Sequence, residues 1–552
     1  MWHPRPCLQV GLFVAGCALA ATAAAAQIIL GSETTVASSA TFQSAPAAAA
    51  DLAGDVVVVW QKQNPNGGWD IFARQYTDSG AAVGPEFQVN TTTGPGCRQF
   101  PAVGVDAAGN FVAVWQSDQE NSGTGVGIYG QRFLSSGLQT GPQEFHVNTT
   151  TTNVHRLPAV AVAPDGRFVV VFQSDGEDGS SWGIFSQAYH SDGTPAGGQF
   201  AVNQTTAGAQ HSPAVAFLAA PPPSGLFEVV WQSAGQDGSG GLAGASGIWG
   251  RALDGTGGAP AGETQIDVPT GAAQGHPRIG ADPSGNYVVA WESVSAAGSG
   301  IYFRRFFANG NPPSTPLPVD AATIGSQRNP AVAADALGRF VVAWDSLGQD
   351  GSGTAVLAQL YDNSGQPPPG VGKLQLNATT PGDQSFVSLG MSAGGNLPAV
   401  YQSQTPAGDA SVILAQPALL PGLQFFTIPP CRLVDTRQPN GPLGGPVLTS
   451  GQPRTFPLLS AQCVIAIPAT AKAVAVNVTA VSSTADGSID IYPGDAPPPP
   501  TSTVNFPFNT TRGNNAVLPL SRNGDGSVSI IATVPGSPGQ VHVLIDASGY
   551  FQ

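Results

Sequence analysis

Arginine and histidine side chains recur at one position of this sequence, directly before short apolar segments that repeat along the chain. Guanidinium and imidazole groups donate hydrogen bonds to carboxylates, phosphates and sugar hydroxyls. If the repeated segments line one axis, these side chains surround a single opening, and we expect a ligand site there. Polar loops that simply cap the opening and bind water are the alternative. The predicted ligand-binding residues are Arg98, His155, Arg156, His211, His276 and Arg328.

Acidic, glycine-rich loops form a second candidate site. The loop richest in carboxylates contains Asp175, Glu177 and Asp178, which we predict as metal ligands. Calcium binds several oxygen ligands from such loops, so calcium is the one cofactor that the sequence suggests. The spacing does not match an EF-hand, and Asp followed by Gly is also common in ordinary turns.

Two further carboxylates, Glu292 and Asp345, occupy a position where five other copies of a repeated phrase have Gln. A pair of carboxylates can act as acid and base in a glycosidase. The strands that carry them are expected to diverge, so a hydrogen-bonded role at a strand end is the preferred interpretation. The sequence contains no nucleophile-elbow, zincin or P-loop motif, and no catalysis is evident.

The repeated phrase itself resembles Phe-Val-Val-Val-Trp-Gln-Ser and occurs seven times. Its aromatic residues lie 53 to 60 residues apart. Short strands that repeat at such a period are typical of β-propeller blades. We therefore predict an all-β fold with a seven-bladed β-propeller over residues 27–420. The aromatic positions are Trp60, Trp115, Phe172, Trp231, Trp291, Trp344 and Tyr401.

Each repeat contains four strand-like pieces, but the seventh lacks its last one. Residues 27–31 precede the first repeat, where a last strand would lie. Pairing of residues 27–31 with residues 412–415 would close the ring and remove an open sheet edge. A linear stack of β-repeats is the alternative.

The composition limits the kinds of partner. Charged residues make up 10% of the chain and the net charge is −15, so no nucleic-acid partner is expected. Residues 1–26 are typical of a secretory signal peptide, after which no transmembrane segment follows. A lipoprotein anchored through Cys17 is the alternative.

The end of the chain has a different pattern. Residues 421–430 are expected to form a linker, and alternating apolar residues over 431–552 predict a β-sandwich. In an oxidising compartment Cys431 and Cys463 form a plausible disulfide pair, which leaves Cys97 alone.

Four segments resemble a C-terminal module of secreted bacterial proteins, often found beside hydrolases or repeat domains. They are Cys431–Arg437, Thr503–Phe506, Arg512–Ala516 and Asp546–Phe551. The region 27–420 similarly resembles repeat arrays of secreted bacterial proteins. The resemblance implies an extracytoplasmic bacterial protein and carries no activity.

Together these patterns predict a secreted or cell-surface binding protein, with no catalysis evident. Its partner would be a carbohydrate, a peptide or an envelope component, held at the propeller opening or by the blade loops. A propeller glycoside hydrolase or polysaccharide lyase is one alternative, and a structural surface or adhesion component is another.

Overall fold

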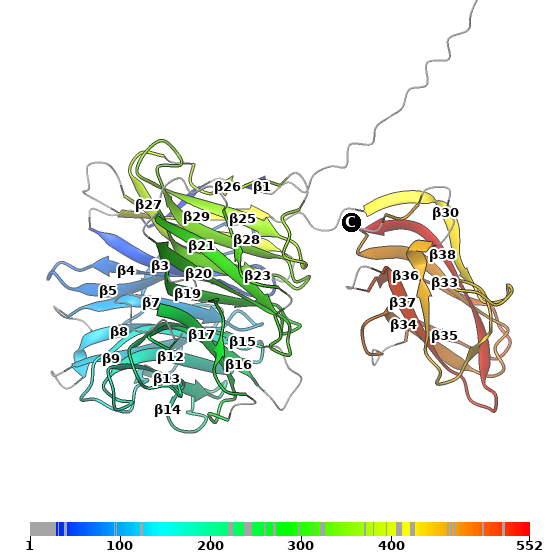
Figure 1. Cartoon of the computed structure of the whole chain (residues 1–552), viewed down its shortest axis with the longest axis horizontal. Helices are drawn as coiled ribbons and strands as arrows, with labels where there is room; N and C mark the ends of the chain where they lie inside the picture. The colour runs from blue at the N-terminus through cyan, green and yellow to red at the C-terminus, as the bar shows by residue number, and fades with distance from the viewer. Residues whose placement is uncertain are drawn as a thin grey trace, which may run out of the picture. The chain divides into compact units, whose positions relative to one another are not determined.

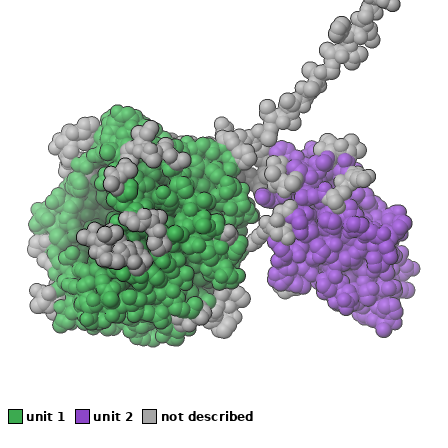
Figure 2. Space-filling model, in the orientation of Figure 1, with its two compact units in different colours: residues 1–420 green, residues 421–552 purple. Residues whose placement is uncertain are grey.

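In the computed structural model of the protein the chain divides into two compact units, residues 1–420 and 421–552 (Figure 2). The predicted signal peptide, Cys17 and the start of the predicted linker lie outside the described residues. The structure describes residues 29–30, 33–37, 41–92, 94, 96–121, 125–218, 225–236, 246–258, 261–268, 272–295, 298–312, 314–320, 326–368, 371–378, 380–392, 395–404, 411–419, 425–460, 463, 466–468, 471–498, 502–521 and 525–551.

The described part of the first unit consists of antiparallel sheets, and it contains no α-helix, which confirms the predicted all-β fold. Seven sheets follow one another along the chain (Figure 1). Their strands are β3 (Gln43–Ala50), β4 (Val56–Gln63), β5 (Trp69–Tyr76) and β6 (Phe87–Gln88); β7 (Arg98–Val105), β8 (Phe111–Asn121), β9 (Gly125–Phe133) and β10 (Gln139–His146); β11 (His155–Val162), β12 (Phe168–Asp175), β13 (Trp182–Tyr189) and β14 (Phe200–Ala201); β15 (Gln210–Phe217), β16 (Phe227–Ala234), β17 (Ser246–Leu253) and β18 (Thr264–Gln265); β19 (Ala273–Ala281), β20 (Tyr287–Ser295), β21 (Gly298–Phe306) and β22 (Leu317–Pro318); β23 (Gln327–Ala334), β24 (Phe340–Leu347), β25 (Thr354–Tyr361) and β26 (Leu374–Gln375); and β27 (Asp383–Leu389), β28 (Asn396–Gln404) and β29 (Ser411–Leu419), with β1 (Ile29–Leu30) and β2 (Thr34–Ala37).

The second strand of each sheet carries the repeated phrase. These strands are rich in Val, whose branched side chain favours extended backbone. In β4 the run Val58, Val59 and Trp60 is fully buried, because a neighbouring sheet covers each face. The repeated phrase is therefore a core element, and its aromatic residue fills the space between consecutive sheets.

The first strands of the sheets follow one another around a ring. Each contacts the first strand of the next sheet, from β3 with β7 through to β23 with β27. The strand β27 then contacts β3, which joins the last sheet to the first. This closed order of antiparallel sheets is that of a β-propeller.

The N-terminal segment completes the last sheet, although in a different register from the predicted one. We expected residues 27–31 opposite 412–415. Instead β2 pairs with Ile413–Ala415, and β1 pairs with Ala418 and Leu419. The register follows from Val36, which is 1% exposed and packs beside Val58 and Trp60. Burial of that side chain fixes which residues face β29.

The second unit contains two antiparallel sheets with a shared apolar core. The predicted linker is shorter than expected, because β30 already begins at Phe425, where Phe426 stacks on Tyr550 with ring centroids 5.1 Å apart. One sheet has the order β30-β38-β33-β36 with β31 beside β38, and the other has the order β32-β37-β34-β35. The elements are β30 (Phe425–Asp435), β31 (Leu448–Thr449), β32 (Arg454–Pro457), a 3₁₀ turn (Leu458–Ser460), β33 (Ala473–Val481), β34 (Gly487–Pro493), β35 (Val504–Phe506), β36 (Arg512–Pro519), β37 (Ser527–Thr533) and β38 (Gln540–Phe551).

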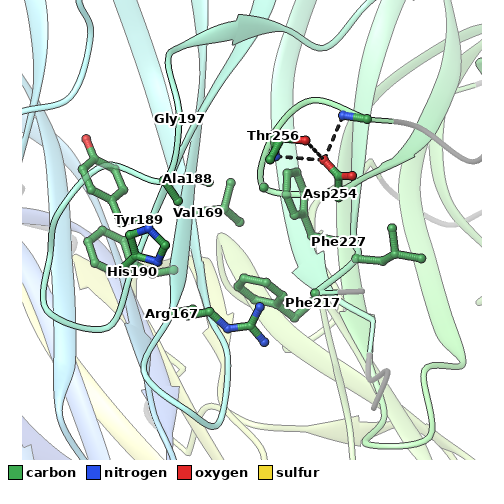
Figure 3. A pocket seen from close by; sticks show the side chains of 16 residues that line it. Arg167, Val169, Ala188, Tyr189, His190, Gly197, Phe217, Phe227, Asp254 and Thr256 are labelled. Carbon is green, nitrogen blue, oxygen red and sulfur yellow. Dashed lines mark hydrogen bonds between the residues drawn. The ribbon is translucent and has the colours of Figure 1, made fainter. Parts of the chain in front are cut away.

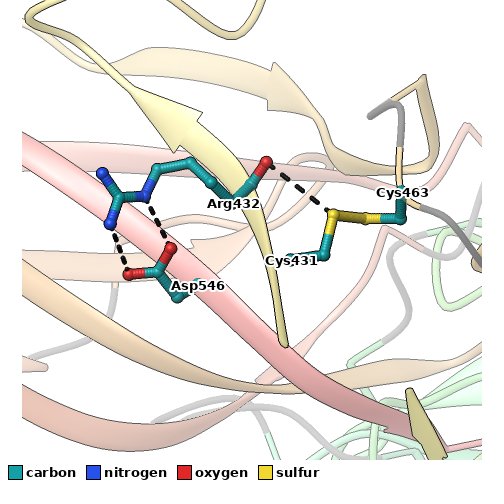
Figure 4. The surroundings of a disulfide bond; sticks show 4 residues. All are labelled: Cys431, Arg432, Cys463 and Asp546. Atoms are coloured by element: carbon teal, nitrogen blue, oxygen red, sulfur yellow. Dashed lines mark hydrogen bonds and ion pairs between the residues drawn. A yellow bond between two sulfur atoms is a disulfide. The ribbon is translucent and has the colours of Figure 1, made fainter. Parts of the chain in front are cut away.

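A disulfide joins Cys431 and Cys463, whose Cα atoms are 5.7 Å apart, and this confirms the predicted pair (Figure 4). Next to it, Arg432 on β30 binds the carboxylate of Asp546 on β38 through Nε at 2.6 Å and through a terminal nitrogen at 3.0 Å. Disulfides persist in oxidising compartments, so the bond is typical of an extracytoplasmic protein. Among the described residues no helix has the length and apolar character needed to cross a membrane.

Candidate functional site

Each first strand has a buried polar residue at its start or directly after its first residue, and we call this the first position. Arg98 and His155, two of the predicted ligand-binding residues, occupy it and are fully buried. Arg98 contacts Asp70 at 3.4 Å, while His155 contacts Glu177 at 3.2 Å. Both side chains are therefore engaged within the protein and do not face solvent. The residues at the first position are Gln43, Arg98, His155, Gln210, Gln274, Gln327 and Gln384.

Two residues further on, each first strand has a β-bulge with left-handed backbone, which we call the third position. The pairing register with the second strand shifts at this point in every sheet. Such bulges change the direction of a side chain at a strand end. The third-position residues, with φ between 50° and 57°, are Ala45, Phe100, Leu157, Ser212, His276, Asn329 and Phe386.

The polar residue after the aromatic anchor holds the bulge of the following sheet. Gln116 in β8, for example, accepts a hydrogen bond from the backbone N–H of Leu157 in β11 at 3.2 Å. Because the contact joins equivalent residues of consecutive sheets, the first strands begin at the same end of the ring. The other described contacts of this kind run from Phe100 N to Gln61, from Ser212 N to Gln173, from Asn329 N to Glu292 and from Phe386 N to Asp345.

Glu292 and Asp345 perform this role and both bind Asn329. Glu292 accepts from the backbone N–H of Asn329 at 2.6 Å, and Asp345 accepts from its side-chain amide at 2.7 Å. The second oxygen of Glu292 lies 3.1 Å from Nδ1 of His276. Burial raises the pKa of Asp345 to about 7. The pair thus acts as a contact between sheets, which is the role preferred from the sequence.

The remaining predicted residues lie at this same end and reach solvent. Arg156 and Arg328 stand at the second position and are exposed, with no hydrogen-bond or ion-pair partner among the described residues. The side chain of His276 is 54% exposed. His211 is half-buried beside Trp182, with ring centroids 5.8 Å apart, and burial lowers its pKa.

Two exposed phenylalanines at this end were not among the predicted residues. Phe100 is 45% exposed and Phe386 is 49% exposed, both at the bulged third position. The sequence could have indicated them, because each is an aromatic residue at the third position, where four other copies of the repeat have a small or polar residue. We call the exposed set the mouth ring, which comprises Phe100, Arg156, His211, His276, Arg328 and Phe386.

The predicted metal ligands point in different directions. Glu177 accepts hydrogen bonds from Ser174, Thr150 and Gln199, besides His155. Burial on its own raises the pKa of Glu177, but the hydrogen bonds from His155, Thr150 and Ser174 together lower it below its ordinary value.

Asp178 accepts from Asn203 and from the backbone of Ser180, whereas Asp175 is exposed at the end of β12. The described residues contain no group of three His, Cys, Asp or Glu side chains placed to hold a metal. Calcium binding stays a prediction, which thermal shifts with calcium and with chelator would check.

No family model and no curated protein matches the chain. Solved structures do show likenesses, at low identity. A protein of unknown function from Dyadobacter fermentans is 10% identical, with a TM-score of 0.43 over 71% of this chain and 99% of that one. An α-L-arabinanase from Penicillium chrysogenum with arabinobiose is 14% identical, with a TM-score of 0.39 over 58% and 92%. The β-propeller domain of the Trilobed protease from Pyrococcus furiosus is 8% identical, with a TM-score of 0.39 over 68% and 93%. All three TM-scores lie below 0.5, so the activities in these names stay with those proteins.

Proposed function

We propose that the protein is a secreted or cell-surface binding protein that holds a carboxylate-bearing carbohydrate at the mouth ring. The observation that carries this proposal is the exposure of Arg156 and Arg328, for which the described residues supply no hydrogen-bond or ion-pair partner. A guanidinium binds a carboxylate through two parallel hydrogen bonds, which gives both energy and direction. His211 and His276 add donors between these two arginines in chain order.

The aromatic members of the ring favour a sugar over a simple anion. Phe100 and Phe386 each expose a large apolar surface that the fold does not need for its core. An aromatic face offers a flat contact area that costs little conformational entropy when it binds. A chain of sugar rings with carboxyl groups matches both kinds of side chain.

The architecture in this proposal is a seven-bladed propeller followed by a sandwich module. Each of the seven sheets is one blade, and the mouth ring surrounds the axial opening at the end where the first strands begin. The contacts from β27 to β3 and the equivalent contacts to five of the seven bulges support this arrangement. The shared core between the two sheets of 431–552 supports a sandwich.

The test is a binding screen on the full mature chain with oligogalacturonate as the acidic probe and the matching neutral oligosaccharide beside it. We expect the triple variant Arg156→Ala, His211→Ala, Arg328→Ala to bind oligogalacturonate at least tenfold more weakly. The variant Arg512→Ala, which removes an exposed arginine from the second unit, is the matched control. Unchanged binding in the triple variant would overturn the proposal.

A hydrolase acting on carbohydrate remains the second candidate, and it depends on Glu292 and Asp345. The raised pKa of Asp345 is the property of a general acid. Both carboxylates are nevertheless buried and hydrogen-bonded to Asn329, which favours the binding function. Release of reducing ends from oligogalacturonate, lost in Glu292→Gln, would support the hydrolase instead.

A further inference from the structure

A pocket lies between the third and fourth sheets, at the end of the first unit opposite to the mouth ring (Figure 3). Its volume is about 750 Å³. Its walls come from the start of β12, the end of β13, the end of β15 and the start of β16, with the turns that follow β13 and β17. Cavities between roughly 300 and 1,000 Å³ hold ligands of several hundred daltons.

The pocket coincides with the place where the repeat departs from its own pattern. In the other six sheets a five-residue turn joins the first two strands, as from Asp106 to Asn110. In the fourth sheet the corresponding backbone hydrogen bond runs from Leu218 to Leu226 at 2.9 Å, so two leucines take the places that Asp106 and Asn110 have in the second sheet. Since six sheets form without this change, the fold does not require it.

The floor of the pocket is apolar. Phe217 and Phe227 meet edge to face with centroids 6.0 Å apart, and Val169 and Ala188 lie opposite them (Figure 3). Phe217 is half-buried, so part of its ring is available to a ligand. A ligand here must present an apolar face of its own to be favoured over water.

The rim carries polar groups of opposite charge that are only partly used. Arg167 donates from Nε to Asp165 at 2.8 Å, and its two terminal nitrogens have no partner among the described residues. Across the pocket, one oxygen of Asp254 accepts from Thr256 and Gly258, and its other oxygen accepts no hydrogen bond within the described structure. His190 is exposed beside Arg167.

This combination selects a neutral ligand with hydroxyl groups. A strongly anionic ligand would meet Asp254, and a cationic one would meet Arg167. A pure hydrocarbon would desolvate both charges without offering them hydrogen bonds, which is costly. Sugar hydroxyls donate to a carboxylate and accept from a guanidinium, while the C–H faces of the ring contact phenylalanine.

We propose that this pocket binds a neutral oligosaccharide of two or three rings, independently of the mouth ring. Its occupant enters between the turns after β13 and β17 and lies over Phe217, with hydroxyls directed to Arg167 and Asp254. The protein would then hold a glycan at each end of the first unit, an acidic one at the mouth ring and a neutral one here.

Saturation-transfer NMR on the full chain tests this site, with cellotriose, maltotriose, arabinotriose and chitotriose as separate probes. Ala196 lines the pocket, so Ala196→Phe places a large side chain there while it keeps Arg167 and Asp254 in the sequence. Val83→Phe is the matched control, because Val83 N bonds Gln75 O as Ala196 N bonds Ala188 O. We expect at least one trisaccharide to bind, with a loss of tenfold or more in Ala196→Phe and none in Val83→Phe.

Asp254→Asn is the second variant, since it keeps the turn with Thr256 and changes only the charge. It should weaken the same trisaccharide severalfold while oligogalacturonate binding at the mouth ring stays unchanged. No signal from any of the four probes, or a signal that survives Ala196→Phe, would overturn the site. Binding lost in the mouth-ring triple variant but kept in Ala196→Phe would assign the neutral sugar to the mouth ring.

Discussion

Asp345 replaces the glutamine that five other copies of the repeated phrase have after the aromatic anchor. It keeps the contact with the bulge of the next sheet but brings a group that can carry a charge. The carboxylate accepts from Asn329 and from the backbone of Phe386, as the glutamines of other sheets accept from their bulges. One of its oxygens is buried and accepts no hydrogen bond from the described residues. A glutamine can do the same work uncharged, whereas the carboxyl group of Asp345 is disfavoured in its charged form by burial, although the hydrogen bonds from Asn329 and Phe386 favour that form.

The first prediction concerns the pH dependence of stability. Burial raises the pKa of Asp345 from 3.8 to about 7, so its contribution is fully present below pH 4 and is lost as pH rises through 7. Between pH 4 and pH 7 the free energy of unfolding of the wild-type protein should fall by an amount on the order of 4 kcal/mol. The variant Asp345→Asn should not show this fall. Denaturant unfolding at pH 4, 6 and 8 measures the effect, with exposed Asp165→Asn as control. Identical pH profiles for wild type and Asp345→Asn would contradict it.

At the scale of elements, the short closing strand β2 makes several contacts that hold the last sheet to the first. It supplies Val36, whose carbonyl accepts from Arg74 at 3.0 Å, just as the carbonyl of Val202 accepts from Arg251 at 2.8 Å in the fourth sheet. Glu33 before it accepts from the hydroxyl of Tyr401. These contacts give the last sheet the outer strand that its own repeat lacks.

The second prediction therefore targets Val36. Val36→Ala removes two buried methyl groups and should cost about 2 kcal/mol of the free energy of unfolding. It should also increase aggregation on heating, because the edge of β29 opens more often. Val83→Ala is the control, as Val83 is 60% exposed. Equal melting temperatures for the two variants would show that β2 is dispensable.

The sequence predicted the elements better than the directions of their side chains. The spacing of the aromatic anchors was sufficient to predict the repeated sheets, because a buried strand appears in the sequence as an uninterrupted run of β-branched and aromatic residues. It could not separate Arg98, which is buried, from Arg156, which is exposed, since both precede an apolar run. Alternation along the strand places these two arginines on opposite faces, because Arg98 stands at the first position and Arg156 at the second. Phe100 and Phe386 were missed because the left-handed bulge on which they stand was not predicted from the sequence.

At the scale of the whole molecule, the two units carry different sources of stability. The first closes on itself through a strand from the start of the chain, and the second has the disulfide Cys431–Cys463. A crosslink acts mainly by restricting the unfolded chain, with a larger effect for longer loops.

The third prediction follows from that difference. Cys463→Ser should lower the free energy of unfolding of the second unit by about 3 kcal/mol and leave the first unit unchanged. Differential scanning calorimetry should show two transitions, of which the variant shifts one. Val36→Ala should shift the other, which makes the two variants controls for each other. A shift of both transitions by either variant would mean that the units unfold together.

The pairing of β2 with β29 has a consequence for how the chain is made. The residues that pair are separated by most of the first unit, from Thr34–Ala37 to Ile413–Ala415. All seven repeats must therefore be synthesised before the ring can close. Until then the first sheet lacks its contacts with the last one. Contacts so distant in sequence form slowly. Closure of the last sheet by β2 therefore follows the synthesis of all seven repeats, and a chain truncated before β29 should lack this closure and be more sensitive to protease.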